Sequence, residues 1–124
     1  MTGTTLALIL VSVTLSACAQ VLFKLGVAPV PGQAILPGAS LIGTVLGILL
    51  RPGVLGGLAL YGIGTVIWLR ALAQTELSQA YPFVGLGFVM TAALGYLVFN
   101  EAIGPTRLIG IALVIAGVVL VGRS

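Results

Sequence analysis

The chain of 124 residues contains no histidine and no aspartate, and it has a single cysteine, Cys18. A Ser-His-Asp arrangement, a metal site built from His or Cys, and an Asp-rich magnesium site each need residues that are missing. One thiol cannot form an internal disulfide. The sequence therefore predicts a protein that is not an enzyme and that binds no metal or other cofactor.

Charged residues are also scarce, at 6% of the chain against 60% hydrophobic residues. This composition leaves too little polar surface to cover a globule in water, so a lipid bilayer is the solvent that fits. The net charge of +3 comes from five scattered cations rather than a basic run, which argues against binding to nucleic acid. At this length we expect one transmembrane domain over residues 1–124.

The segment Leu15-Ser16-Ala17-Cys18 has the composition of a bacterial lipoprotein cleavage site. A signal peptide needs a basic n-region, but residues 1–5 contain no Lys or Arg, and the apolar run continues past Cys18 to Phe23. We therefore expect no processing here, and we expect Cys18 to be a small packed side chain.

Long apolar runs predict the fold. A hydrocarbon core of ~30 Å needs about 20 helical residues, each adding about 1.5 Å. Four runs reach this length, at about residues 4–28, 52–73, 81–99 and 105–122. Residues 37–50 are too few to span comfortably, so we expect an interfacial helix there, with a re-entrant segment as the alternative. The predicted fold class is all-α: a polytopic membrane protein with four transmembrane helices and a short interfacial helix between the first and second.

Polar residues recur at every fourth position of the first span, at Ser12, Ser16, Gln20 and Lys24, and they share one helix face. Lipid cannot satisfy a polar stripe, so this face should meet protein or a water-filled cavity. We expect the serine hydroxyls to bond back to their own helix. For Gln20 and Lys24 we expect a lumen, the alternative being that Lys24 extends to the headgroups.

The second span has a face made of Gly57, Tyr61, Gly64, Thr65 and Trp68. Aromatic side chains with polar edges can line a pocket, and small residues let a neighbouring backbone or a ligand approach. Close helix packing, with Trp68 at the membrane interface, explains the pattern equally well.

Both acidic residues lie in short polar hinges, Glu76 between the second and third spans and Glu101 between the third and fourth. Hinges place polar groups where water or headgroups can meet them. Glu101 could bind an amino group or pair with Arg107, and a structural role is favoured. The candidate substrate-binding residues are Gln20, Lys24, Tyr61, Thr65, Trp68, Tyr81 and Glu101.

The last span contains small residues suited to a helix–helix dimer contact: Gly110, Ala112, Ala116 and Gly117. Four short helices are too few to enclose a sizeable polar path. We therefore expect a homodimer, or a heterodimer with a similar small subunit.

Four segments together resemble a known superfamily: Trp68 to Leu72, Leu77 to Pro82, Phe99 to Glu101, and Gly110 to Val118. In order and spacing they are similar to the drug/metabolite transporter superfamily, and within it to small EamA-like proteins such as aminoarabinose–phosphoundecaprenol flippase subunits. The resemblance implies a multi-pass transporter of the bacterial inner membrane that flips a polyprenyl-phosphate-linked sugar between leaflets. Gln20 and Lys24 would then hold the phosphate, while Tyr61 and Trp68 would face the sugar or the isoprenoid.

The chain also resembles the small multidrug resistance proteins, with one departure. Members of that family carry a membrane-embedded Glu upstream of a Lys in the first helix and use it to exchange protons for cationic drugs. Ser16 takes the matching position here, ahead of Lys24. Proton-coupled export of organic cations therefore lacks its central group. A small-metabolite or multidrug exporter, and a non-transporting scaffold subunit, are the alternative functions.

Overall fold

The computed structural model describes residues 1–27 and 41–124, and the regular structure within these ranges is entirely helical. The elements are α1 (Gly3–Val27), α2 (Leu41–Leu49), α3 (Pro52–Leu72), α4 (Leu77–Ala80), the 3-10 helix η1 (Tyr81–Phe83), α5 (Val84–Phe99) and α6 (Pro105–Arg123). In the described part of the chain, four helical stretches are long and apolar enough to cross a membrane: α1, α3, Leu77–Phe99 and α6. The predicted all-α class, with a shorter helix between the first two spans, is confirmed.

The third spanning stretch begins before the expected residue 81, because Leu77–Ala80 is already α-helical. Pro82 has no N–H to donate, and the chain passes through the single turn of η1 before α5 begins. Residue 28, the expected end of the first span, lies outside the described residues, as do residues 37–40 of the expected interfacial helix. The location of α2 at a membrane interface stays a prediction.

Local sequence explains where the other helices start and stop. Pro52 and Pro105 occupy the first turns of α3 and α6, where a missing N–H costs nothing. At the end of α5, Asn100 adopts a left-handed conformation with φ 59, which Asn tolerates better than most residues. The N–H groups of Asn100 and Glu101 both bond to the carbonyl oxygen of Gly95. The chain therefore turns back sharply and brings Glu101 beside α5.

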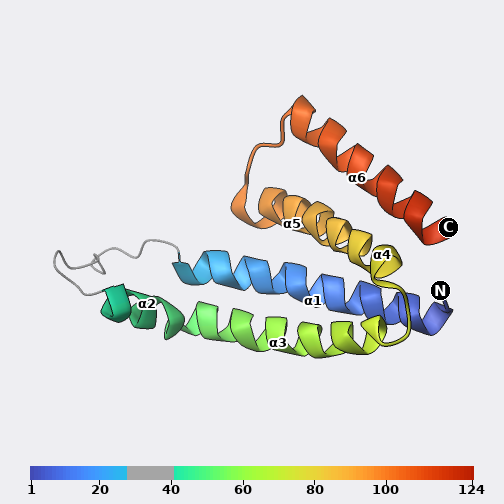
Figure 1. Ribbon diagram of the computed structural model, residues 1–124. Helices are drawn as coiled ribbons and strands as arrows, with labels where there is room; N and C mark the ends of the chain where they lie inside the picture. Colours follow the sequence, from blue (N-terminus) through green and yellow to red (C-terminus); the bar gives the residue numbers. More distant parts are fainter. Residues whose placement is uncertain (28–40) are drawn as a thin grey trace.

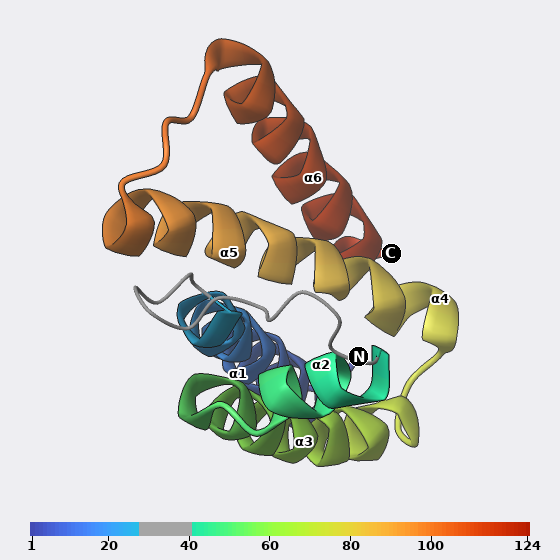
Figure 2. The same ribbon diagram turned by 90° about the vertical axis from the view of Figure 1, so that its left-hand side faces the viewer.

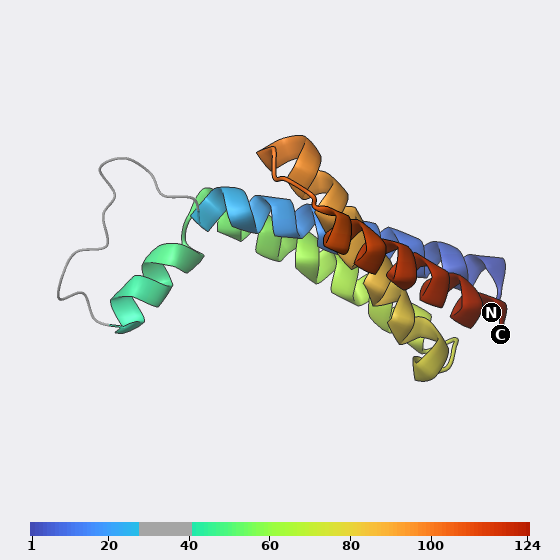
Figure 3. The ribbon, with the colours of Figure 1, turned by 90° about the horizontal axis from the view of Figure 1, so that it is seen from above.

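Helix α1 lies at the centre of the molecule, with α3 along one side and α5 on the other (Figures 1 and 2). α6 contacts α5 and η1, and it diverges from α5 towards its own N-terminal end (Figure 1). Both chain termini lie at one end of the bundle, whereas α2 lies beyond the other end (Figure 3). Any groove along α1 is therefore bounded by α3 and α5.

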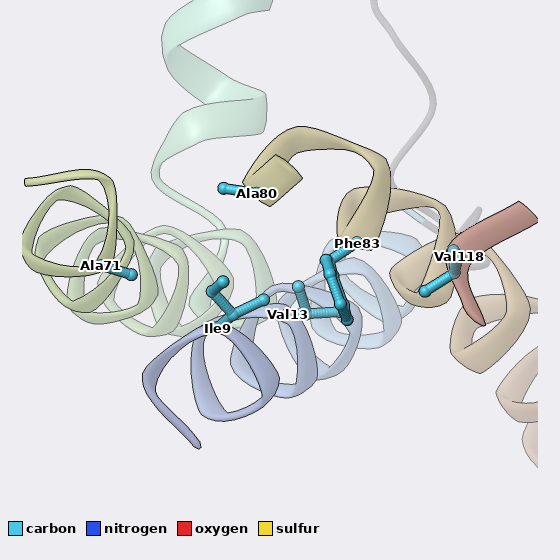
Figure 4. Close-up of a cluster of buried hydrophobic side chains, with 6 residues drawn as sticks. All are labelled: Ile9, Val13, Ala71, Ala80, Phe83 and Val118. Atoms are coloured by element: carbon cyan, nitrogen blue, oxygen red, sulfur yellow. The ribbon is translucent and has the colours of Figure 1, made fainter. Parts of the chain in front are cut away.

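One cluster of buried hydrophobic side chains, drawn in Figure 4, lies towards the end of the bundle that carries the termini. It comprises Ile9, Val13, Ala71, Ala80, Phe83 and Val118, which come from five different elements. Two hydrogen bonds tie the same end together: Thr5 Oγ1 donates to Gln74 Oε1 at 3.0 Å, and Gln79 Nε2 donates to the Ser124 carbonyl at 3.3 Å. This end of the bundle is closed by packing.

Away from this cluster, many large apolar side chains are exposed. A bilayer can surround them, because lipid tails are as apolar as a leucine side chain. Val118 is the one buried residue of α6 among the described residues. Cys18 was expected to be packed, and that expectation is wrong: its side chain is exposed. A thiol behaves as a small hydrophobic group and is compatible with a lipid-facing position.

The four small residues of α6 expected at a dimer contact do not pack closely against the rest of the described chain. A Cβ added at Gly110 or Gly117 would meet no atom within 4 Å, and Ala112 and Ala116 are exposed. Their use in a contact with a second subunit stays a prediction.

Two glycines allow α1 and α3 to touch where α1 ends. A Cβ on Gly26 would lie 2.6 Å from the Val54 nitrogen, and one on Gly53 would lie 2.8 Å from the Gly26 Cα. Arg51 joins the helices at the same level, because its Nη1 donates to the Gly26 carbonyl at 3.1 Å, where a cation also suits the C-terminus of α1. Backbone atoms cannot move aside as the end of a side chain can, so this contact depends on glycine.

We predict that Gly53→Ala destabilises the fold by about 1–3 kcal/mol, because the added methyl overpacks a backbone contact. Gly62→Ala in the same helix is the matched control, since a Cβ there meets no neighbouring atom of the described residues within 4 Å. The control should be neutral or stabilising by up to about 1 kcal/mol. Unfolding in mixed detergent micelles measures both variants, and equal stability would contradict the proposed contact.

Candidate functional site

Two adjoining cavities lie beside α1: the larger is lined from α1, α3 and the η1–α5 segment, and the smaller from α1, α5, the turn after α5 and α6. Their volumes are about 560 Å³ and about 390 Å³. Gln20, Phe88 and Thr91 line both, so the cavities form one groove. Of the described residues that line the larger cavity, none is charged, and we call it the neutral chamber. The smaller cavity is lined by Lys24, Glu101 and Arg107 among others, and we call it the charged end.

The polar stripe of α1 faces this groove. Ser12 and Ser16 line the neutral chamber, Gln20 lines both parts, and Lys24 lines the charged end. Ser12 does not bond back to its own helix as expected: its Oγ donates to the Gly64 carbonyl of α3 at 2.7 Å. Gly64 permits this, because a Cβ there would lie only 3.3 Å from the Ser12 carbonyl oxygen. Ser12 thus joins two helices inside the membrane-spanning region.

The face of α3 contributes both to close helix packing and to the lining of a cavity, the two explanations that the sequence left open. Gly57 provides close packing, since a Cβ there would lie 2.6 Å from the ring of Phe23. Tyr61, Thr65 and Trp68 line the neutral chamber, and Tyr81 of η1 joins them. The chamber is therefore bordered by hydroxyl, amide and indole groups set among apolar ones.

The α5 side of the groove was missed by sequence reasoning. Phe88 and Thr91 line both cavities, and the Thr91 Oγ1 donates to the Phe88 carbonyl at 2.9 Å. Phe88 and Thr91 are three positions apart and so share a helix face, which was the available signal. A lone threonine in a span rich in small residues did not stand out.

At the charged end, Lys24 and Glu101 form an ion pair that joins α1 to the turn after α5. The Lys24 Nζ also lies 4.7 Å from the centroid of the Phe99 ring, a cation–π distance. The two side chains are 54% and 40% exposed, and an ion pair that is not buried contributes only about 0.2–1 kcal/mol. The pair can therefore open at small cost.

Glu101 does not pair with Arg107, the partner that the sequence left open. The Arg107 Nη1 donates instead to the Ala102 carbonyl at 3.1 Å. The turn at Asn100 directs the carboxylate towards α1, away from the start of α6. Two cations and one carboxylate therefore border the same cavity.

This arrangement can hold an amphipathic ligand. Ammonium and guanidinium groups bind phosphate or carboxylate, and a carboxylate binds an ammonium. The neutral chamber suits an uncharged group that offers hydroxyls or an apolar face.

Sequence comparisons identify relatives of known type. Over 82 residues the chain is 38% identical to the probable 4-amino-4-deoxy-L-arabinose-phosphoundecaprenol flippase subunit ArnE of Pseudomonas savastanoi pv. phaseolicola, covering 59% of this chain and 72% of that protein. Over 63 residues it is 41% identical to the protein of the same description from Pseudomonas aeruginosa, covering 51% and 55%. An uncharacterized protein of Sinorhizobium fredii, y4nH, is 34% identical over 110 residues, which cover 88% of this chain and 86% of that one.

No solved structure is significantly similar to the chain. The sequence profile of the EamA-like transporter family matches residues 3–123. Four helices able to span a membrane agree with a multi-pass protein of this kind. Because the match covers almost the whole sequence, the chain belongs to the EamA-like transporter family.

Proposed function

We propose that this chain is one subunit of a dimeric transporter that moves a polyprenyl-phosphate-linked sugar between the leaflets of the bacterial inner membrane. The observation that carries the proposal is the groove beside α1. It joins an uncharged polar and aromatic chamber to a charged end, within a chain whose outer surface is largely apolar.

The transport problem explains why such a groove is needed. An unprotected charged headgroup in hydrocarbon costs many kcal/mol, so polar groups must replace its water. Lys24 and Arg107 offer two cations for the phosphate, and Gln20 lies between them and the chamber. Tyr61 and Trp68 would face the sugar or the isoprenoid.

The names of the relatives support this substrate class, since two are described as probable flippase subunits for an undecaprenyl-phosphate-linked amino sugar. An amino sugar needs an anionic partner, and Glu101 borders the same cavity as the two cations. The charged end thus offers partners for both charges of such a headgroup.

The exposed side of α6 supports the proposed dimer. Gly110, Ala112, Ala116 and Gly117 leave room for the backbone of another helix. A second copy, or a similar small subunit, packed there would add helices around the groove. Related transporters pair two halves around a midplane site.

Transport is tested by reconstituting the purified chain in proteoliposomes, alone and with candidate partner subunits. A labelled polyprenyl-phosphate sugar should become accessible in the opposite leaflet faster than in protein-free vesicles. No acceleration of transfer with any partner subunit would contradict the proposal and favour a scaffold subunit.

We predict that Lys24→Ala weakens retention of a polyprenyl phosphate about tenfold, because a charge-assisted hydrogen bond contributes roughly 1.5–3 kcal/mol. Native mass spectrometry of the full chain measures the retained lipid. Arg70→Ala is the control, since it removes the same charge from a residue that lines neither cavity. Equal loss in both variants would show that only bulk charge attracts the lipid.

We also predict that cells expressing the chain gain no resistance to quaternary ammonium compounds. The described lining of the neutral chamber contains Ser16 and no carboxylate to bind such a cation. Growth inhibition curves with and without expression test this. A several-fold rise in the inhibitory concentration would contradict the lipid assignment and favour a drug exporter.

A further inference from the structure

We propose that Gly95 is a positioning residue for Glu101, and that an anionic headgroup enters the charged end by displacing Glu101 from Lys24. The second half rests on the proposed function, because it names a phosphate-bearing lipid as the ligand. The first half concerns only the contacts of this chain.

The carboxylate of Glu101 lies directly against the backbone of Gly95. A Cβ on Gly95 would lie 2.6 Å from Glu101 Oε2 and 3.2 Å from its Cδ. The Glu101 N–H also bonds to the Gly95 carbonyl at 3.2 Å, after the left-handed turn at Asn100. Main chain and side chain of Glu101 therefore both return to residue 95, where only glycine leaves room.

From this position the carboxylate reaches Lys24 on α1. Lys24, Glu101 and Gly95 all line the charged end, so the pair lies across part of the cavity wall. Its formation links the last turn of α1 to the end of α5. By positioning Glu101, Gly95 thus determines whether the Lys24 ammonium is paired with a carboxylate before a ligand arrives.

A phosphate oxygen can take the place of the carboxylate oxygen, because both accept charge-assisted hydrogen bonds from an ammonium. Neither side chain of the pair is buried, since they are 54% and 40% exposed, so exchange requires no unfolding. The ammonium has an oxygen partner before and after the exchange. Glu101 therefore competes with the headgroup for Lys24.

A methyl group at residue 95 should move the carboxylate and not the helix. The atom that it would meet is the end of a flexible side chain, which can rotate away. Gly95→Ala should then release Lys24 as Glu101→Gln does. Gly62→Ala is the matched control, since Gly62 lines neither cavity and an added methyl there meets no neighbouring atom of the described residues within 4 Å.

The test uses Lys24 as its own reporter, because it is the only lysine in the chain. The full chain in detergent is treated with a water-soluble amine-acylating reagent, and mass spectrometry resolves Lys24 from the N-terminal amine, which serves as the internal reference. Gly95→Ala and Glu101→Gln should each speed acylation of Lys24 several-fold. The double variant should react no faster than Glu101→Gln alone, since both changes remove one interaction. Gly62→Ala should match the wild type.

An unchanged Lys24 rate in Gly95→Ala, or additive effects in the double variant, would overturn the positioning role. Circular dichroism and elution volume check the fold of each variant. A Gly95→Ala chain that fails to fold would also overturn it, because the structure requires the backbone to tolerate the methyl group.

The ligand half is tested by adding polyprenyl phosphate in nanodiscs, with inorganic phosphate at equal concentration as a separate arm. The lipid should slow Lys24 acylation more in Glu101→Gln than in the wild type, because the competing carboxylate is gone. No protection by lipid in any variant would contradict the proposed substrate while the role of Gly95 stands on the labelling pattern. Equal protection by inorganic phosphate would assign the site to a soluble phosphate compound.

Discussion

Lipid offers no hydrogen-bond partner, and the arrangement of this protein depends on that constraint. Helix α1 carries a polar group at every fourth position through the membrane-spanning region, so one complete face must meet protein or water. Ser12 uses a carbonyl of α3, Lys24 uses Glu101, and Ser16 and Gln20 border the groove. Because α1 lies between α3 and α5, this polar face meets protein groups and the groove.

The two ends of the bundle are held by different forces. Near the termini, apolar side chains from five elements pack together, and hydrogen bonds from Thr5 and Gln79 reinforce the contact. At the other end, α1 and α5 are joined by an exposed ion pair that contributes only about 0.2–1 kcal/mol. The contact between α1 and α5 at the charged end is therefore weaker than the packed contact near the termini.

Periodicity predicted much of the fold. Apolar runs of spanning length gave the four spans and the short helix between the first two, and the spacing from Ser12 to Lys24 gave the polar face of α1. The prolines at residues 52 and 105 marked helix starts, because their physics is local.

Contacts between distant segments could not be predicted in the same way. The sequence does not say which carbonyl of α3 lies level with Ser12, nor that the turn at Asn100 directs Glu101 to Lys24 and not to nearby Arg107. Cys18 was misplaced because a small apolar side chain suits both a packed and a lipid-facing position. Roles of individual groove residues in binding stay predictions, since spacing defines a face but not its ligand.

Cysteine labelling in proteoliposomes tests the central claim, that one face of α1 meets a hydrated groove and another meets lipid. Cys18 is exposed and lines neither cavity, while Gln20, about 200° further around the helix, lines both. The native thiol is compared with the thiol of Gln20→Cys in a Cys18→Ser background. We expect a water-soluble maleimide to label the introduced thiol quickly and Cys18 slowly, and a membrane-soluble reagent to label Cys18. Equal rates with the water-soluble reagent, or faster reaction at Cys18, would contradict the account.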